Sequence, residues 1–206
     1  MEWNLCKNMM TIGNMIILVL VTCILLVPAV SAIPPLPCEY YGQVMIDGAP
    51  APAGTAITAM INGSVRGKMS TGTAGSLGGT GTFDNRLVVS VSEEDIAWNA
   101  SPDVVFYVDG IRADVLDTFG PGESHAVILA TKSLKAVPSF TAKPTDPDGD
   151  FVYEDLNGNG RLDFADVVLY FNQMTWIAAN EPIAAFDLNG NGRIDFADIV
   201  ALFNEI

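Results

Sequence analysis

An internal duplication limits most strongly what this chain can fold into. Residues 155–173 and 187–205 align without gaps at a spacing of 32 residues, and 14 of the 19 aligned positions are identical. Each copy opens with the sequence Asp-Leu-Asn-Gly-Asn-Gly-Arg-(Leu or Ile)-Asp-Phe-Ala-Asp. A duplication this close predicts one supersecondary unit that is used twice.

Each copy carries oxygen-bearing residues at the spacing of a calcium-binding loop. Ca²⁺ prefers roughly six to eight oxygen ligands, and a 12-residue loop supplies them from positions 1, 3, 5, 7, 9 and 12, with glycine at position 6 for the sharp turn. The arginines at position 7 contribute main-chain carbonyls, and position 9 binds directly or through water. We therefore expect two calcium ions, held by Asp155, Asn157, Asn159, Arg161, Asp163 and Asp166 in the first loop and by Asp187, Asn189, Asn191, Arg193, Asp195 and Asp198 in the second.

An amphipathic helix is predicted after each loop. Apolar residues recur there at i, i+3, i+4 and i+7, the period of one helix face: Phe164, Val167, Val168 and Phe171, then Phe196, Ile199, Val200 and Phe203. No helix is expected before the loops, because residues 151–154 are too few and Pro182 interrupts the approach to the second loop. A loop with one helix, and Asp instead of Glu at position 12, departs from the usual EF-hand.

This duplicated loop–helix unit resembles the type I dockerin domain. The resemblance covers residues 155–205, and we place the domain at 146–206. It implies antiparallel exiting helices related by a pseudo-twofold axis, a cohesin module as partner, and extracellular complexes that often degrade polysaccharides. Many bacterial dockerins carry two small hydroxyl residues just before the last calcium ligand. Here those pairs are Phe164-Ala165 and Phe196-Ala197, which argues against a bacterial-type partner. These phenylalanines either make the docking face apolar or pack in the core, and we expect core packing.

Negative charge is concentrated in this C-terminal part. The chain has a formal charge of −14, and residues 146–206 hold 12 Asp or Glu against two Arg. Nucleic acid is therefore not an expected partner. Just ahead of the first loop, Asp146, Asp148 and Asp150 place carboxylates at alternate positions. They form either a third, weaker calcium site with Glu154 contributing, or an acidic linker exposed to solvent.

The first 32 residues have the pattern of a secretory signal peptide. Lys7 precedes an uncharged apolar run over residues 15–27, and Val30 and Ala32 are small residues suited to cleavage after Ala32. The alternative is an uncleaved membrane anchor over residues 15–32. The protein is therefore expected to be secreted or held at the cell surface, with a membrane contact only if the leader is not cut.

Residues 38–131 are predicted to form an all-β sandwich of antiparallel strands. Apolar residues alternate in short runs at 40–46, 55–61, 87–92, 104–108, 111–115 and 126–129. The dipeptides Asp47-Gly48, Asn62-Gly63 and Asp109-Gly110 suit tight hairpin turns. The glycine-rich residues 71–81 are expected to be a mobile loop, and residues 132–145 a linker. Residues 38–129 resemble transthyretin-like and carboxypeptidase-regulatory-like sandwich modules, including the opening segments 41–44 and 49–54.

Nothing in the sandwich sequence favours catalysis. His125 is the only histidine and is expected to be structural, and Cys38 is the only cysteine beyond the leader, so a nucleophilic triad or a zinc site has no support. We expect a non-catalytic secreted protein that docks onto a cohesin-bearing scaffold. The alternative is a cell-surface adhesin or carbohydrate-binding protein in which the calcium loops only stabilise the fold.

Overall fold

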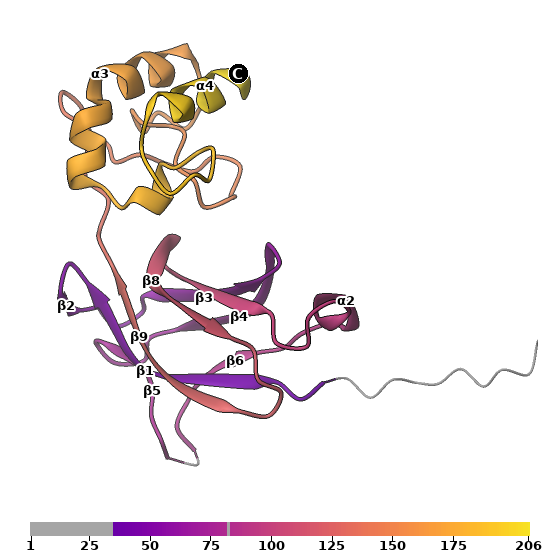
Figure 1. Ribbon diagram of the computed structural model, residues 1–206. Coiled ribbons are helices and arrows are strands. Elements are labelled where there is room, and N and C mark those ends of the chain that lie inside the picture. Colours follow the sequence, from indigo (N-terminus) through magenta and orange to yellow (C-terminus); the bar gives the residue numbers. More distant parts are fainter. Residues whose placement is uncertain (1–34, 82) are drawn as a thin grey trace, which may run out of the picture. The chain divides into compact units, whose positions relative to one another are not determined.

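The computed structural model describes residues 35–81 and 83–206 (Figure 1). The predicted signal peptide, residues 1–32, lies outside these residues. Within the described ranges, no helix is both long enough and apolar enough to cross a membrane.

The N-terminal part is a sandwich of two β-sheets (Figure 1). In the first sheet the central strand β1 (Cys38–Ile46) pairs on one side with β9 (Ser124–Thr131) and on the other with three short strands: β2 (Ala49–Pro50), β5 (Ser76–Gly78) and β6 (Leu87–Val89). The second sheet is antiparallel, in the order β4 (Ser64–Ser70), β3 (Ala56–Ile61), β7 (Asp103–Val108) and β8 (Ile111–Thr118). One short helix, α2 (Glu93–Ile96), follows β6. The all-β sandwich prediction is confirmed.

Alternating residues of both sheets build the sandwich core. In β7, for example, Val104, Phe106 and Val108 are buried while the residues between them are more exposed, as the period of two in a strand requires. The ring of Tyr40 packs edge-on against Phe106 at a centroid distance of 4.9 Å, and its hydroxyl donates to the carbonyl of Thr118. Burying each such large apolar side chain stabilises the fold by roughly 1.5–3 kcal/mol.

The three predicted hairpin turns are present. Asp47, Asn62 and Asp109 have φ values of 52°, 51° and 48°, and the glycine after each also has positive φ. Positive φ at both central residues is the conformation that suits the twist of a two-residue hairpin.

The prediction that all strands run antiparallel is wrong at one pair. β1 and β9 are parallel over residues 39–46 and 124–131, because the chain crosses from β8 in the second sheet and re-enters the first sheet along β1. The strands lie so close that a Cβ on Gly42 would be 2.1 Å from the carbonyl oxygen of Val127. Alternating polarity defines the faces of a strand but carries no information on the direction of its neighbour.

The glycine-rich residues 71–81 were predicted to be a mobile loop, but part of this segment is a strand. Ser76–Gly78 form β5, where Leu77 is fully buried, and the main chain of Val44 donates to the carbonyl of Gly75 at 3.0 Å. One large apolar side chain, that of Leu77, among five glycines was too weak a strand signal. The predicted run 87–92 is also too long, since β6 ends at Val89 and Ser92 caps α2.

The C-terminal part is helical, with a core of its own. It contains α3 (Phe164–Asn180), a short 3₁₀ turn η1 (Ile183–Ala185) and α4 (Phe196–Asn204), which confirms one helix after each loop. The core includes Leu156, Tyr170, Ile177, Phe186 and Leu202. The predicted linker contributes to it through the buried side chains of Leu134 and Val137.

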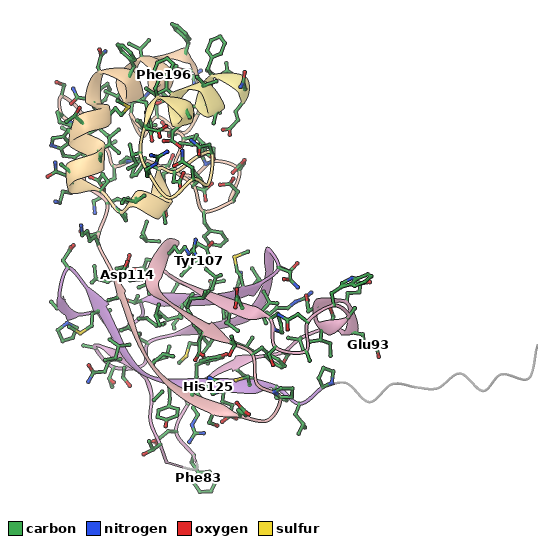
Figure 2. All side chains as sticks on the ribbon, in the orientation of Figure 1. Phe83, Glu93, Tyr107, Asp114, His125 and Phe196 are labelled. Atoms are coloured by element: carbon green, nitrogen blue, oxygen red, sulfur yellow. The ribbon has the colours of Figure 1, made fainter. Side chains whose placement is uncertain are left out.

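The imidazole of His125, labelled in Figure 2, contacts the carboxylates of Asp117 and Glu123. Its Nδ1 is 2.8 Å from Asp117 Oδ2, and its Nε2 is 2.9 Å from Glu123 Oε2. The hydrogen bonds to Glu123 and then to Asp117 raise the pKa of His125 above its usual value. The folded state therefore favours the protonated imidazolium.

This arrangement predicts a pH-dependent contribution to stability. Because the folded pKa is raised, the stabilisation is complete below the unfolded pKa of about 6.5 and is lost as the pH rises through the folded value. The free energy of unfolding should be measured at several pH values from acidic to mildly basic for the wild type and His125→Asn, both in saturating calcium. The difference between them should shrink as the pH rises, and a difference that stays constant would contradict this account.

Candidate calcium loops and the face of the exiting helices

The first loop folds around the carboxylate of its first residue. Asp155 is fully buried, and its oxygens accept the main-chain N–H groups of Asn159 at 3.0 Å and Gly160 at 2.7 Å. Gly160, at position 6, has a φ of +84°, a left-handed conformation that glycine adopts at no steric cost. The loop therefore curls inward onto position 1, as a cation-binding loop of this length must.

The end of the loop is also the beginning of α3. Asp163, at position 9, is the N-cap and accepts the N–H of Ala165 at 2.8 Å, while Asp166, at position 12, accepts the N–H of Asp163 at 3.0 Å. These reciprocal bonds are a capping box. The residues predicted to complete a calcium site thus also fix where the helix starts.

Position 3 is tied to position 12. The main-chain and side-chain amides of Asn157 donate to Asp166 Oδ1 at 3.2 Å and 2.8 Å. Rotating the side-chain amide of Asn157 by half a turn would place its oxygen where its nitrogen now lies, so that the oxygen could face a cation. Asn159 and Arg161 lie on the exposed rim, where the Asn159 side chain accepts the N–H of Arg161 at 3.0 Å.

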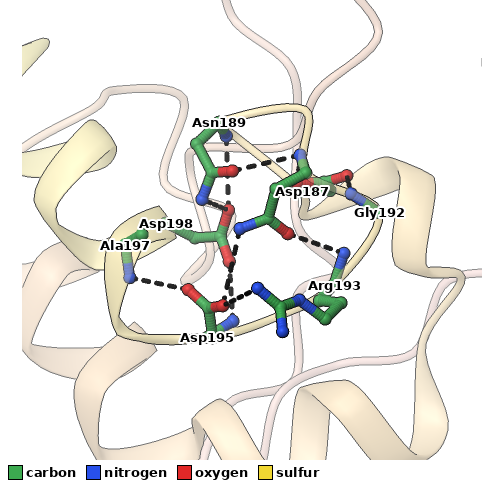
Figure 3. A network of polar contacts seen from close by, with 8 residues as sticks. Asp187, Asn189, Gly192, Arg193, Asp195, Ala197 and Asp198 are labelled. Atoms are coloured by element: carbon green, nitrogen blue, oxygen red, sulfur yellow. Dashed lines mark hydrogen bonds and ion pairs between the residues drawn. The ribbon is translucent and has the colours of Figure 1, made fainter.

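The second loop repeats this network (Figure 3). Asp187 accepts the N–H groups of Asn191 at 3.0 Å and Gly192 at 2.6 Å, and Asn189 donates to Asp198 at 2.7 Å. A second capping box starts α4, with Asp198 accepting the N–H of Asp195 at 2.7 Å. On the rim, Arg193 donates its N–H to the Asn191 side chain. The duplication in sequence is therefore a duplication in structure.

The buried carboxylates of the loops have no basic partner among the described residues. Asp155, Asp166 and Asp198 are fully buried, whereas Arg161 and Arg193 are exposed and approach only the position 9 carboxylates, at 3.9 Å and 3.5 Å. Burial raises the pKa of Asp166, and repulsion from Asp155 and Asp163 adds to that shift. Buried charge is costly unless it is paired. An oxygen-rich, net-negative loop of this kind fits a hard divalent cation.

The exiting helices present a shared apolar face. Ring pairs join the start of α3 to the end of α4 and the middle of α3 to the start of α4, with centroid distances of 6.4 Å for Phe164 and Phe203 and 6.5 Å for Phe171 and Phe196. This reciprocal pairing shows that α3 and α4 lie antiparallel and are related by a pseudo-twofold axis, as the resemblance implied. The face encloses a groove of about 450 Å³ in which Asn172 is the one polar lining residue.

The expectation that the loop phenylalanines pack in the core is wrong. Phe164 and Phe196 are each 59% exposed, and the Phe196 ring points away from the domain core (Figure 2). The core positions are instead Val167 and Ile199, one residue after each buried position 12 aspartate. The buried aspartates could have set the rotation of the helices, since the residue after a buried helical position is a better core candidate than one two positions before it.

The comparisons with known proteins agree with this geometry. No curated protein matches the chain. The family described as "Dockerin type I domain" matches residues 153–206. With its duplicated loops and antiparallel exiting helices, this C-terminal part of the chain is a type I dockerin domain.

Proposed function

We propose that the chain is a non-catalytic secreted protein that uses its dockerin domain, loaded with two calcium ions, to dock onto a cohesin-bearing scaffold. The observation that carries the proposal is the apolar face shared by α3 and α4, which the repeat builds twice. The assembly would be an extracellular complex of the kind that degrades polysaccharides.

The predicted ligands fit the role of holding calcium. In the first loop Asp155, Asn157, Asn159, the carbonyl of Arg161, Asp163 and Asp166 would hold one ion, and their counterparts 32 residues later the other. Bound calcium would supply the positive charge that the buried carboxylates lack. Calcium binding would then also stabilise the start of each helix, because Asp166 and Asp198 each close a capping box.

The exposed aromatic rings favour a partner with an apolar surface. Four phenylalanines, each more than half exposed, lie on one face: Phe164, Phe171, Phe196 and Phe203. Exposed apolar patches of this kind mark interaction sites, and aromatic residues contribute strongly to binding when they become buried. The cohesin should therefore offer apolar pockets at the positions where bacterial-type partners meet hydroxyl groups.

Two features support a non-catalytic, exported protein. Both nitrogens of His125 are already engaged by carboxylates, so this residue is poorly placed to act as a general base on a substrate. The leader pattern of residues 1–32 and the extracellular setting of dockerin domains together favour secretion.

Removing position 1 from both loops should abolish calcium-dependent folding of the dockerin domain. The double variant Asp155→Ala, Asp187→Ala should lose both loop ions in calorimetry and the calcium-induced helix signal in circular dichroism. Each ion should stabilise the wild type by about 2.7 kcal/mol at a calcium concentration 100 times its dissociation constant. Asp114→Ala, an exposed change in β8, is the control. A double variant that still gains helix with calcium would contradict the proposal.

Truncating the exposed rings should weaken cohesin binding without unfolding the domain. Phe164→Ala and Phe196→Ala should together lower the affinity by at least tenfold, since buried aromatic anchors commonly contribute more than about 1–2 kcal/mol each. Either single change should cost less, because the twofold repeat leaves the other half intact. Binding is measured by titration calorimetry against a panel of cohesins, and Thr175→Ala, exposed on α3 outside the groove, is the control. Equal affinities for the double variant and the wild type would exclude this face as the docking surface.

A further inference from the structure

The segment before the first calcium loop is itself a closed loop. Thr145 and Asp155 form an antiparallel bridge, with N–H to carbonyl distances of 2.9 Å and 3.3 Å. The Thr145 hydroxyl also donates to Asp155 Oδ2 at 2.5 Å. Residues 146–154 therefore form a loop that is closed by Thr145 and Asp155, and Asp155 is position 1 of the first calcium loop.

Four carboxylates converge inside this closed segment. One oxygen from each of Asp146, Asp148, Asp150 and Glu154 lies within 4.8 Å of all the others. Across residues 35–81 and 83–206, this is the one group of three or more acidic, histidine or cysteine side chains gathered so tightly. Two oxygens bound to the same calcium ion at about 2.3–2.6 Å lie at most about 5 Å apart. The four oxygens therefore fit within one coordination sphere.

Glu154 gives independent evidence for a ligand. Its side chain is 3% exposed, and its Oε2 atom is buried without a hydrogen-bond partner. A buried polar atom in a folded protein is nearly always paired, so an unpaired carboxylate oxygen needs an explanation. An acidic linker in solvent, the alternative interpretation of this sequence, would leave Glu154 exposed.

No basic side chain compensates the cluster. Among the described residues, no Lys or Arg forms an ion pair with any of the four carboxylates. Glu205, the residue after α4, is a further acid in this region, where burial and then the charges of Asp150 and Asp148 raise its pKa. The surroundings thus add negative charge and increase the need for a cation.

We propose that Asp146, Asp148, Asp150 and Glu154 form a third calcium site that is separate from the two dockerin loops. Its ligand is a hard divalent cation that accepts an all-oxygen set, and calcium fits better than magnesium because magnesium dehydrates reluctantly and binds few protein ligands. Because the Thr145 and Asp155 bridge closes the segment, an ion here also holds position 1 of the first loop in place. The third site thereby favours calcium binding by that loop, which goes beyond the docking function proposed above.

The test is the number of calcium ions bound by the full chain. Equilibrium dialysis with metal analysis should give three ions per chain for the wild type and two for Glu154→Gln, which keeps the shape of the side chain but removes its charge. Glu205→Gln, which changes a neighbouring acid outside the ligand set, should still bind three. A wild type that binds only two ions, or a Glu154→Gln variant that binds three, would overturn the proposal.

A thermal measurement separates loss of the site from a folding defect. In chelator, Glu154→Gln should melt no lower than the wild type, because it removes an unpaired buried charge. In saturating calcium it should gain less in melting temperature than the wild type does. If Glu154→Gln fails to fold, Asp148→Asn and Asp150→Asn should each lose one ion, and retention of three ions by both variants would overturn the proposal.

The wild type should keep three calcium ions in a tenfold excess of magnesium, and loss of one to magnesium would overturn the choice of calcium.

Discussion

Buried negative charge without a basic partner is the constraint on which the C-terminal domain depends. Asp155, Asp166 and Asp198 are fully buried, and the two arginines of the domain reach only the exposed rim of each loop. A buried carboxylate in that position must take up a proton or meet a cation. Asp166 and Asp198 also cap the exiting helices. The same two carboxylates therefore need a compensating charge and fix the start of each helix.

The apolar face of α3 and α4 follows from where the helices start. Once the capping box fixes Asp166 toward the loop interior, the period of the helix turns Val167 and Tyr170 into the core and leaves Phe164 and Phe171 in solvent. The same rotation in α4 exposes the equivalent rings. The pseudo-twofold axis then brings the two sets together as one apolar surface. The candidate calcium ligands and the exposed aromatic rings are therefore adjacent in the chain.

The sequence predicted local features well and long-range features poorly. The left-handed glycine at position 6 of each loop, the helix after each loop and the positive φ of the hairpin residues all follow from contacts a few residues apart. The parallel pairing of β1 with β9 and the burial of Leu77 depend on residues brought from elsewhere in the chain. The exposure of Phe164 was missed for a related reason, since periodicity defines an apolar stripe but not which edge of it meets the core.

The two parts of the chain neutralise buried acids by different means. In the sandwich, the buried carboxylate of Asp95 is met by the Arg66 guanidinium at 2.8 Å and by the Ser92 hydroxyl, so its charge is balanced by residues of the same fold. Residues 146–206 hold only two arginines, both on loop rims, against 12 acids. A domain so built needs positive charge from outside the polypeptide, and calcium, which dockerin domains bind, supplies charge of that kind. The sandwich, in contrast, balances the charge of Asp95 from within its own fold.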